Sequence, residues 1–156
     1  MQSVTPFLTF KEKGAEAIQL YVSLVKNSKI TSLVRSEGGG PFPKGALQHA
    51  IFELDGQEFM AMDAGPDFSF AQGFSIMVRC ETQEEIDLLY DRLSEGGEQQ
   101  PCGWLLDRYG LSWQIIPSTL GDLLMDEDAE KSKRVMDAML QMKKIILKDL
   151  QGAYAQ

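Results

Sequence analysis

The spacing of apolar and polar residues changes period several times along the first half of the chain, and each change predicts a new element. Strand-like stretches rich in β-branched and aromatic residues alternate with one stretch of helical spacing. A run rich in Gly and Pro predicts a loop, and Asp55-Gly56 predicts a tight hairpin turn. The predicted order is strand, helix, strand, loop, strand and strand, over residues 4–10, 13–26, 29–35, 37–45, 46–54 and 57–62.

The second half repeats this pattern in shortened form. A strand is predicted over 74–81, and Thr82 and Glu85 have the spacing of a capping box that opens a helix. The apolar residues that this helix is expected to bury are Ile86, Leu89, Tyr90 and Leu93, before it stops at Gly96-Gly97. The remaining predicted elements are short strands over 98–100, 103–107 and 111–116 and a tail helix over about 129–147.

The two halves align with each other. Tyr21 and Tyr90 occupy the same helical position at an offset of 69 residues, while Gly56 and Gly110 occupy the same turn at an offset of 54. The second half is therefore shorter between its helix and its last hairpin, and the Gly/Pro loop of the first half accounts for much of the difference. A duplicated β-α-β-β-β unit follows from this comparison.

These elements predict an α+β fold made of two tandem βαβββ modules that form a curved mixed sheet around a cavity, plus a C-terminal helix. Each module has a helix on one face of its sheet, which leaves the other face for a cavity. We expect a single domain over residues 1–156. Its predicted parts are repeat one at about 1–67, repeat two at about 70–118 and a C-terminal helical tail at 119–156.

The amino-acid composition and net charge limit the classes of partner that the protein could bind. Of the 156 residues, 44% are apolar and 24% charged, as in ordinary globular proteins, and the net charge is −8. That charge disfavours nucleic acid and anionic membrane surfaces as partners. The two cysteines do not form a disulfide framework, and neither a signal-peptide pattern nor a membrane-spanning apolar run is present. We expect a cytoplasmic protein.

Several stretches resemble a known family. The motifs are 30–32 (ITS), 52–60 (FELDGQEFM), 102–107 (CGWLLD), 110–114 (GLSWQ) and 138–144 (AMLQMKK). With the duplicated unit, they resemble the vicinal-oxygen-chelate superfamily of glyoxalase, bleomycin-resistance and dioxygenase proteins. The similarity is to its PhnB-like branch, often labelled 3-demethylubiquinone-9 3-methyltransferase-like, and extends into the tail. No Gly-rich strand-to-helix turn for S-adenosylmethionine is found beside it.

The resemblance implies where a metal would bind. In the superfamily, His and Glu on the first and last strands of each half hold a divalent cation. The internal repeat locates these vestigial ligand positions at Pro6 and Ser75 on the first strands and at Met60 and Gln114 on the last. Proline does not ligate, methionine is a soft ligand, and Ser and Gln are weak neutral donors. We therefore predict no metal and no cofactor.

Strand alternation predicts which side chains face the cavity. The expected ligand-binding residues are Met60, Met62, Ser75, Met77, Arg79 and Gln114, joined on the same face by His49 and Glu53. An apolar lining with a few polar groups is typical of small-molecule sites. Each residue also has a structural interpretation: the methionines could fill the core, and Arg79 could form a surface ion pair.

Three residues are candidates for catalysis. His49 could act as a general base oriented by Glu53, or the two could be a solvated hydrogen-bonded pair. Cys102 could be a nucleophile or a buried structural cysteine, and no cation is placed in the sequence to lower its pKa. Trp104 and Trp113 are expected to be packing elements.

Three functional hypotheses remain. The leading one is a metal-independent protein that binds a small organic molecule in its cavity. The second is a lyase, isomerase or transferase that uses His49, Glu53 or Cys102, or a metal held by other ligands. The third is a non-catalytic dimeric module for binding or sequestration. Because the tail helix carries a Met-rich stripe outside a complete two-module core, we expect a homodimer with this helix near the interface.

Overall fold

The computed structural model describes residues 3–156, which divide into two compact units, one ending at Ala71 and the other beginning at Gln72. The first unit contains β1 (Phe7–Phe10), α1 (Gly14–Leu24), β2 (Lys29–Arg35), β3 (Leu47–Leu54) and β4 (Gln57–Asp63). The second contains β5 (Ser75–Cys80), α2 (Gln83–Ser94), β6 (Glu98–Gln99), the 3₁₀ turn η1 (Pro101–Gly103), β7 (Trp104–Leu106), β8 (Ser112–Pro117), α3 (Leu120–Leu124), α4 (Ala129–Leu140) and α5 (Leu147–Ala155). Among residues 3–156, no helix is long and apolar enough to cross a bilayer.

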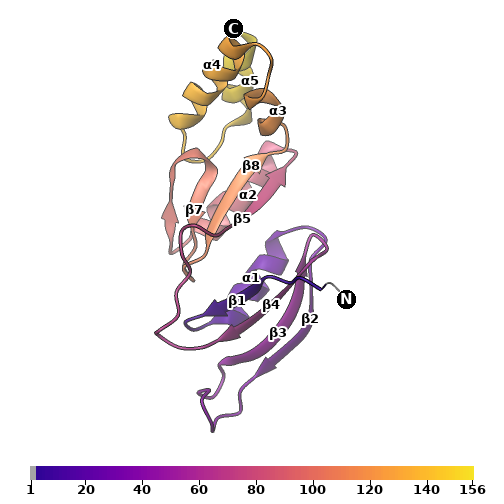
Figure 1. The fold of residues 1–156 in the computed structure, drawn as a ribbon, viewed down its shortest axis with the longest axis vertical. Helices are drawn as coiled ribbons and strands as arrows, with labels where there is room; N and C mark the ends of the chain where they lie inside the picture. The colour runs from indigo at the N-terminus through magenta and orange to yellow at the C-terminus, as the bar shows by residue number, and fades with distance from the viewer. Residues whose placement is uncertain (1–2) are drawn as a thin grey trace. The chain divides into compact units, whose positions relative to one another are not determined.

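The first unit is a four-stranded sheet in the order β1-β4-β3-β2, with α1 against one face (Figure 1). Strands β1 and β4 are parallel, and the other neighbours are antiparallel. The predicted hairpin turn is confirmed, because Asp55 and Gly56 both have positive φ, as the tightest hairpin turn requires. The side chains facing α1 alternate along the strands and are fully buried; they include Leu8, Phe10, Ala50, Phe52 and Ala61.

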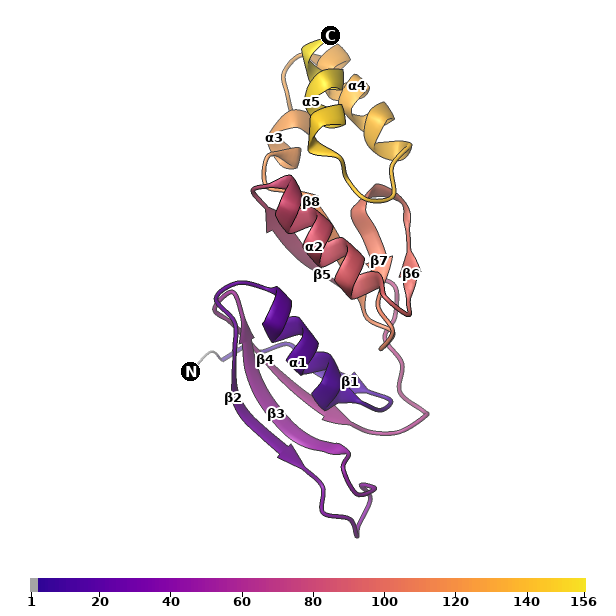
Figure 2. The same cartoon turned by 180° about the vertical axis from the view of Figure 1, so that it is seen from behind.

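The second unit repeats the first. Its sheet order is β5-β8-β7-β6, with β5 and β8 parallel, and α2 lies on one face (Figure 2). The duplicated βαβββ prediction is therefore confirmed. So is the capping box: Thr82 Oγ1 accepts from the Glu85 N–H at 3.2 Å, and the Glu85 carboxylate accepts from the Thr82 N–H. The predicted buried residues of α2 are buried, and they pack near the fully buried Trp113 and Ile115.

Two predicted boundaries were wrong. The first strand begins at Phe7 rather than at residue 4, and Val4 is 83% exposed. The single tail helix is two helices, α4 and α5, separated by residues 141–146. Helical spacing continues through this segment, but its backbone groups bond elsewhere. The N–H groups of Cys102 and Gly103 donate to the Met142 and Lys143 carbonyls at 2.9 and 2.8 Å.

The tail has a small core of its own. Leu120, Val135, Ile145 and Leu150 are buried together, and Met139 and Met142 pack against them as partly buried neighbours. Ile145 is the buried residue of the segment between α4 and α5. The Asp128 carboxylate caps α4, because it accepts from the Glu130 and Lys131 N–H groups.

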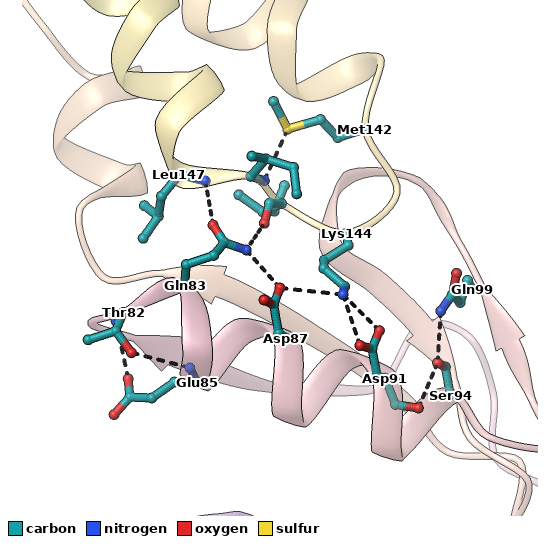
Figure 3. A network of polar contacts seen from close by, with 12 residues as sticks. Thr82, Gln83, Glu85, Asp87, Asp91, Ser94, Gln99, Met142, Lys144 and Leu147 are labelled. Atoms are coloured by element: carbon teal, nitrogen blue, oxygen red, sulfur yellow. Dashed lines mark hydrogen bonds and ion pairs between the residues drawn. The ribbon is translucent and has the colours of Figure 1, made fainter.

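A polar network fastens the tail to α2 (Figure 3). The Gln83 side chain donates to the Ile145 carbonyl at 3.0 Å and accepts from the Leu147 N–H at 2.8 Å. Lys144 Nζ lies 2.9 Å from Asp91 Oδ1 and 3.4 Å from Asp87 Oδ1. The two Gln83 bonds engage backbone groups of Ile145 and Leu147 that a continuous tail helix would have used in helical hydrogen bonds, and the Lys144 ion pairs add to them.

Candidate small-molecule site

Each unit has one sheet face that its own helix does not cover, called here the open face. In the second unit, cross-strand pairing aligns Met77 on β5, Gln114 on β8 and Trp104 on β7 in one row. Met77 is 48% exposed, and the Gln114 and Trp104 side chains are half-buried. A thioether, an amide and an indole therefore lie side by side on this face.

Polar groups flank that row. Gln114 Nε2 donates to Ser75 Oγ at 2.9 Å, which fixes the amide against β5. Arg79 is exposed two residues beyond Met77, on the same face by alternation. Within residues 3–156, the Arg79 guanidinium makes neither an ion pair nor a hydrogen bond. Every other arginine of the chain is engaged, either by a carboxylate or by backbone carbonyls. Arg79 is the arginine left available to a ligand.

The open face of the first unit consists of three rows. The pairing places Phe7 beside Met60 and Ile51, and the next row pairs Thr9 with Met62. His49, two residues before Ile51 on β3, lies on the same face by alternation. Apart from Phe7, which is exposed, these side chains are half-buried. Met60, Met62 and His49 therefore share the open face, as the alternation of residues along the strands predicted.

The third row is polar. Glu53 on β3 is directly opposite Glu58 on β4, and Lys29 Nζ approaches Glu53 Oε2 at 3.5 Å. Thr5 Oγ1 donates to Glu58 Oε1 at 3.4 Å. His49 lies four residues from Glu53 along an extended strand, a separation of about 13 Å. Glu53 is thus the partner of Lys29 and does not orient His49, so the predicted pair does not form.

The positions equivalent to metal ligands need one correction. Phe7 pairs with Met60 and Met77 pairs with Gln114 in the two parallel ladders. With Met60 equivalent to Gln114, the first strands align at an offset of 70 residues rather than 69. The counterpart of Ser75 is therefore Thr5, while Pro6 falls on the opposite alternation. One residue of slip changes the face to which a strand position belongs.

The residues at these positions do not fit a divalent cation. Ser75 and Gln114 hydrogen-bond to each other, Met60 offers a soft thioether, and Thr5 is bonded to Glu58. Hard cations prefer several carboxylate or carbonyl oxygens, and zinc prefers thiolate and imidazole. Over the part of the chain that the structure describes, no group of three or more His, Cys, Asp or Glu side chains is placed to hold a metal.

Cys102 lies away from both open faces, at the junction with the tail. Its backbone has φ 62°, its N–H donates to the Met142 carbonyl, and its thiol donates to the Met139 carbonyl at 3.7 Å. Gly103 follows with φ 81°, and its N–H bonds to the Lys143 carbonyl. These contacts favour the structural interpretation of Cys102, because both its N–H and its thiol bond to the tail.

Shifted pKa values mark groups that hold α2 and the tail in place. Burial raises the pKa of Tyr90 to about 12, and its hydroxyl donates to the Gln100 and Trp104 carbonyls. The Gln83 amide, followed by Lys144, holds the pKa of Asp87 below its usual value despite desolvation. Partial burial lowers the pKa of Lys144, but Asp91 and Asp87 outweigh it and leave the pKa raised.

Asp126 and Tyr154 form a similar hydrogen-bonded pair within the tail. The Asp128 N–H, and then the Tyr154 hydroxyl, lower the pKa of Asp126. The same Asp126 raises the pKa of Tyr154, whose hydroxyl donates to Asp126 Oδ2 at 2.7 Å. These contacts lie among the tail's own helices, so they are structural.

Sequence reasoning missed several residues of the open faces, among them Trp104, Glu58 and Phe7. Trp104 was expected to be a packing element, but Leu105 is the buried residue and Trp104 alternates with it. Glu58 and Phe7 were not considered, although each is two residues from Met60 or one from Leu8 on an alternating strand. Applying the same alternation to every strand would have found all three.

Comparisons with known proteins agree with this architecture. The family model for 3-demethylubiquinone-9 3-methyltransferase matches residues 2–116. A PhnB protein from Bacillus cereus is 39% identical, with a TM-score of 0.66 over 74% of this chain and 99% of its own. A Pseudomonas aeruginosa protein is 23% identical, with a TM-score of 0.61 over 75% and 98%. No protein among those with curated descriptions matches.

A more distant structure shares the fold alone. It is a mutant of the fosfomycin resistance protein FosX from Listeria monocytogenes, solved with Mn(II) and 1S,2S-dihydroxypropylphosphonic acid. It is 16% identical, with a TM-score of 0.53 over 78% of this chain and 98% of its own. The family match stops at residue 116, so these comparisons do not support the expected extension of the resemblance into the tail. The chain belongs to the 3-demethylubiquinone-9 3-methyltransferase (PhnB) family, within the vicinal-oxygen-chelate superfamily.

Proposed function

We propose that this protein binds a small organic molecule on the open faces of its sheets and does so without a divalent metal. The hydrogen bond between Ser75 and Gln114, at two positions where the superfamily places ligands, is the observation that carries the proposal. A side-chain amide fixed by a hydroxyl is preorganised to bond a ligand and is a poor ligand for a hard cation.

The neighbouring side chains suggest what the molecule offers. Trp104 and Met77 supply apolar and polarizable surface beside Gln114, and Arg79 supplies a cation whose guanidinium has no partner among residues 3–156. A flat or branched apolar body with a carbonyl or acid group would use all four. On the first unit, Met60, Met62 and Ile51 supply a second apolar row.

Two other activities have less support. FosX, which has the same fold, was solved with Mn(II), but the residues at the equivalent positions here are not comparable donors. Methyl transfer, which the family description names, would need a site for a methyl donor. The glycines at 38–40 lead into prolines rather than into a helix, so they do not form the turn that holds such donors.

We also infer a homodimer in the cytoplasm. The tail carries apolar side chains in solvent, with Met125 85% and Leu140 55% exposed, and Met136 is on the same helix as Leu140. Apolar surface of this kind is often covered by a second subunit. Sedimentation at several protein concentrations tests the assembly, and a monomer at every concentration would contradict it.

The test of the main proposal has two parts. Elemental analysis of protein soaked with Zn, Mn, Fe and Ni should show far less than one metal per chain. A thermal-shift screen of small organic acids and carbonyl compounds should then give hits that Gln114→Leu and Arg79→Gln each weaken. Arg92→Gln, on the outer surface of α2, is the matched control and should leave the hits unchanged. One tightly held metal per chain, or hits indifferent to both substitutions, would refute the proposal.

A further inference from the structure

We infer that a depression in the first unit is a second binding site, for a small organic anion with an apolar body. Its volume of about 480 Å³ lies in the range of small-molecule pockets. Three segments surround it: the connection from β1 to α1, the end of β4, and the loop from β2 to β3. Its lining includes Lys11, Glu12, Lys13, Glu16, Phe42, Met62 and Asp63.

The loop from β2 to β3 is a fixed wall, although its glycines and prolines predict only an irregular segment (Figure 2). The buried Ser36 donates through its N–H to the Ala46 carbonyl at 2.8 Å and through its hydroxyl to the Phe42 carbonyl at 3.3 Å. Arg35 Nη1 donates to the Gly45 carbonyl at 3.2 Å. Phe42, which lies between two prolines, is thus held over the depression before any ligand arrives, which lowers the entropic cost of binding.

The opposite wall is also fixed by backbone bonds. The N–H groups of Ala64 and Gly65, after β4, donate to the Phe10 and Lys11 carbonyls at 2.9 and 3.1 Å. Lys13 has φ 62°, a conformation uncommon for a residue other than glycine. The connection therefore runs in a defined path beside Met62.

The charged side chains of the lining indicate which class of ligand fits the depression. Of the three carboxylates in the lining, Glu16 pairs with Arg35 at 3.4 Å. Both oxygens of Asp63 accept backbone N–H groups, from Gly14 and Leu47. The ammonium groups of Lys11 and Lys13 make no ion pair or hydrogen bond within residues 3–156. The groups left to pair with a ligand are therefore two ammonium groups and one carboxylate, Glu12. The backbone bonds of Asp63 leave its charge in place, so the preference for an anion depends on these two ammonium groups and not on an excess of positive charge.

Phe42, the flanking prolines and Met62 supply the apolar surface, so the fitting ligand has an aromatic or aliphatic body and one acid group. This site shares only Met62 with the open faces, and it does not rest on the function proposed above.

Two dyes with the same aromatic body separate the two contributions. The anionic 8-anilinonaphthalene-1-sulfonate and the neutral N-phenyl-1-naphthylamine should both bind, as fluorescence titrations report. The double substitution Lys11→Gln with Lys13→Gln should raise the Kd of the sulfonate about fivefold to tenfold at low salt and leave the neutral dye unchanged. Phe42→Ala should weaken both dyes, and Phe42→Leu should restore the neutral one.

Nuclear magnetic resonance of ¹³C-methyl methionine locates the site. The Met62 methyl should shift with dye concentration, while the methyl of Met139, which packs against the tail core, should not. Phe42→Ala should reduce the Met62 shift. Failure of the wild-type protein to bind the sulfonate, unchanged affinity in Phe42→Ala, or an equal loss of both dyes in the lysine double variant would each overturn the inference. None of these outcomes bears on Gln114 or Arg79.

Discussion

The two units start their helices in different ways. In the second unit, α2 begins with a local capping box in which Thr82 and Glu85 satisfy each other's backbone N–H groups. In the first unit, the residue before α1 is Lys13, which has no side-chain cap. The Gly14 N–H instead donates to Asp63, a buried carboxylate 49 residues away at the end of β4. The start of α2 is thus capped by residues next to it in the sequence, whereas the start of α1 is capped by a residue of the sheet.

The distant cap couples more of the fold. Asp63 accepts from Gly14 at 2.9 Å through one oxygen and from Leu47, at the start of β3, at 2.8 Å through the other. A single carboxylate thus joins α1, β3 and β4. In the second unit, the position equivalent to Asp63 is Pro117, which has no such group, so α2 must be capped from its own sequence. Loss of the first cap should therefore cost more than loss of the second.

The substitution with the largest expected effect on this difference between the two helix caps is Asp63→Ala. It leaves two buried N–H groups unsatisfied, so we expect a loss of about 3 kcal/mol in the free energy of unfolding. Urea denaturation measures this, and the exposed Asp67→Ala is the matched control, with an expected change near zero. A loss under about 1 kcal/mol would show that the carboxylate is not the link between the three elements.

The second contrast is the tail, which only the second unit carries. Gly103→Ala should cost about 2 kcal/mol, because φ is 81° and the added Cβ would lie 2.7 Å from the Ile115 carbonyl oxygen and 3.1 Å from Ile145 Cγ1. Gly152→Ala is the control within the tail. It has open space and lies inside α5, so we expect a gain of about 0.5–1 kcal/mol. Equal effects of the two substitutions would contradict the role of Gly103 in docking.

These contrasts also explain what the sequence could predict. The capping box, the Asp55-Gly56 turn and the buried residues of α2 depend on neighbours within a few positions, and all were predicted. The cap by Asp63 spans 49 residues, so no local pattern contains it. The break in the tail is similar: apolar spacing continues through 141–146, but bonds from Cys102, Gly103 and Gln83 decide its path.

The candidate site, too, was predictable only where it depends on residues close together in the sequence. Alternation along single strands placed Met60, Met62, Met77 and Gln114 on the open faces. It did not give the register between strands, so Pro6 was taken where Thr5 belongs, and Lys29 was not recognised as the residue across from Glu53. Register is a property of two strands together, and one sequence segment specifies only its own alternation.

A smaller effect tests the local cap of α2. Thr82→Ala removes one side-chain acceptor and should cost about 1 kcal/mol, well below the cost of Asp63→Ala. Hydrogen exchange should show faster exchange confined to the first turn of α2, since the rest of the helix is held by its buried face. Thr119→Ala, at the start of α3 without a side-chain cap bond, should change stability by less than about 0.3 kcal/mol.

The smallest expected effect is the pH dependence of tail docking through Asp87. Its folded pKa lies below the ordinary value of 3.8, so its ionised form stabilises the fold above about pH 4. That contribution is lost as pH falls through the folded pKa. Lys144 has the opposite sign: its raised pKa means that its contribution is present below 10.5 and is lost only above it.

Both side chains are partly in solvent, so the contribution at neutral pH should not exceed about 1 kcal/mol. Comparison of wild-type protein with Asp87→Asn by thermal denaturation should therefore show a small, constant difference between about pH 5 and 8 that shrinks as the pH falls below about 4 and through the folded pKa of Asp87. Asp137→Asn, whose carboxylate pairs with Lys133 on the surface of α4, is the control for a purely exposed pair. A difference that grows as the pH falls would mean that the ionised form of Asp87 is not favoured in the folded protein, and that its contacts with Gln83 and Lys144 do not fasten the tail to α2.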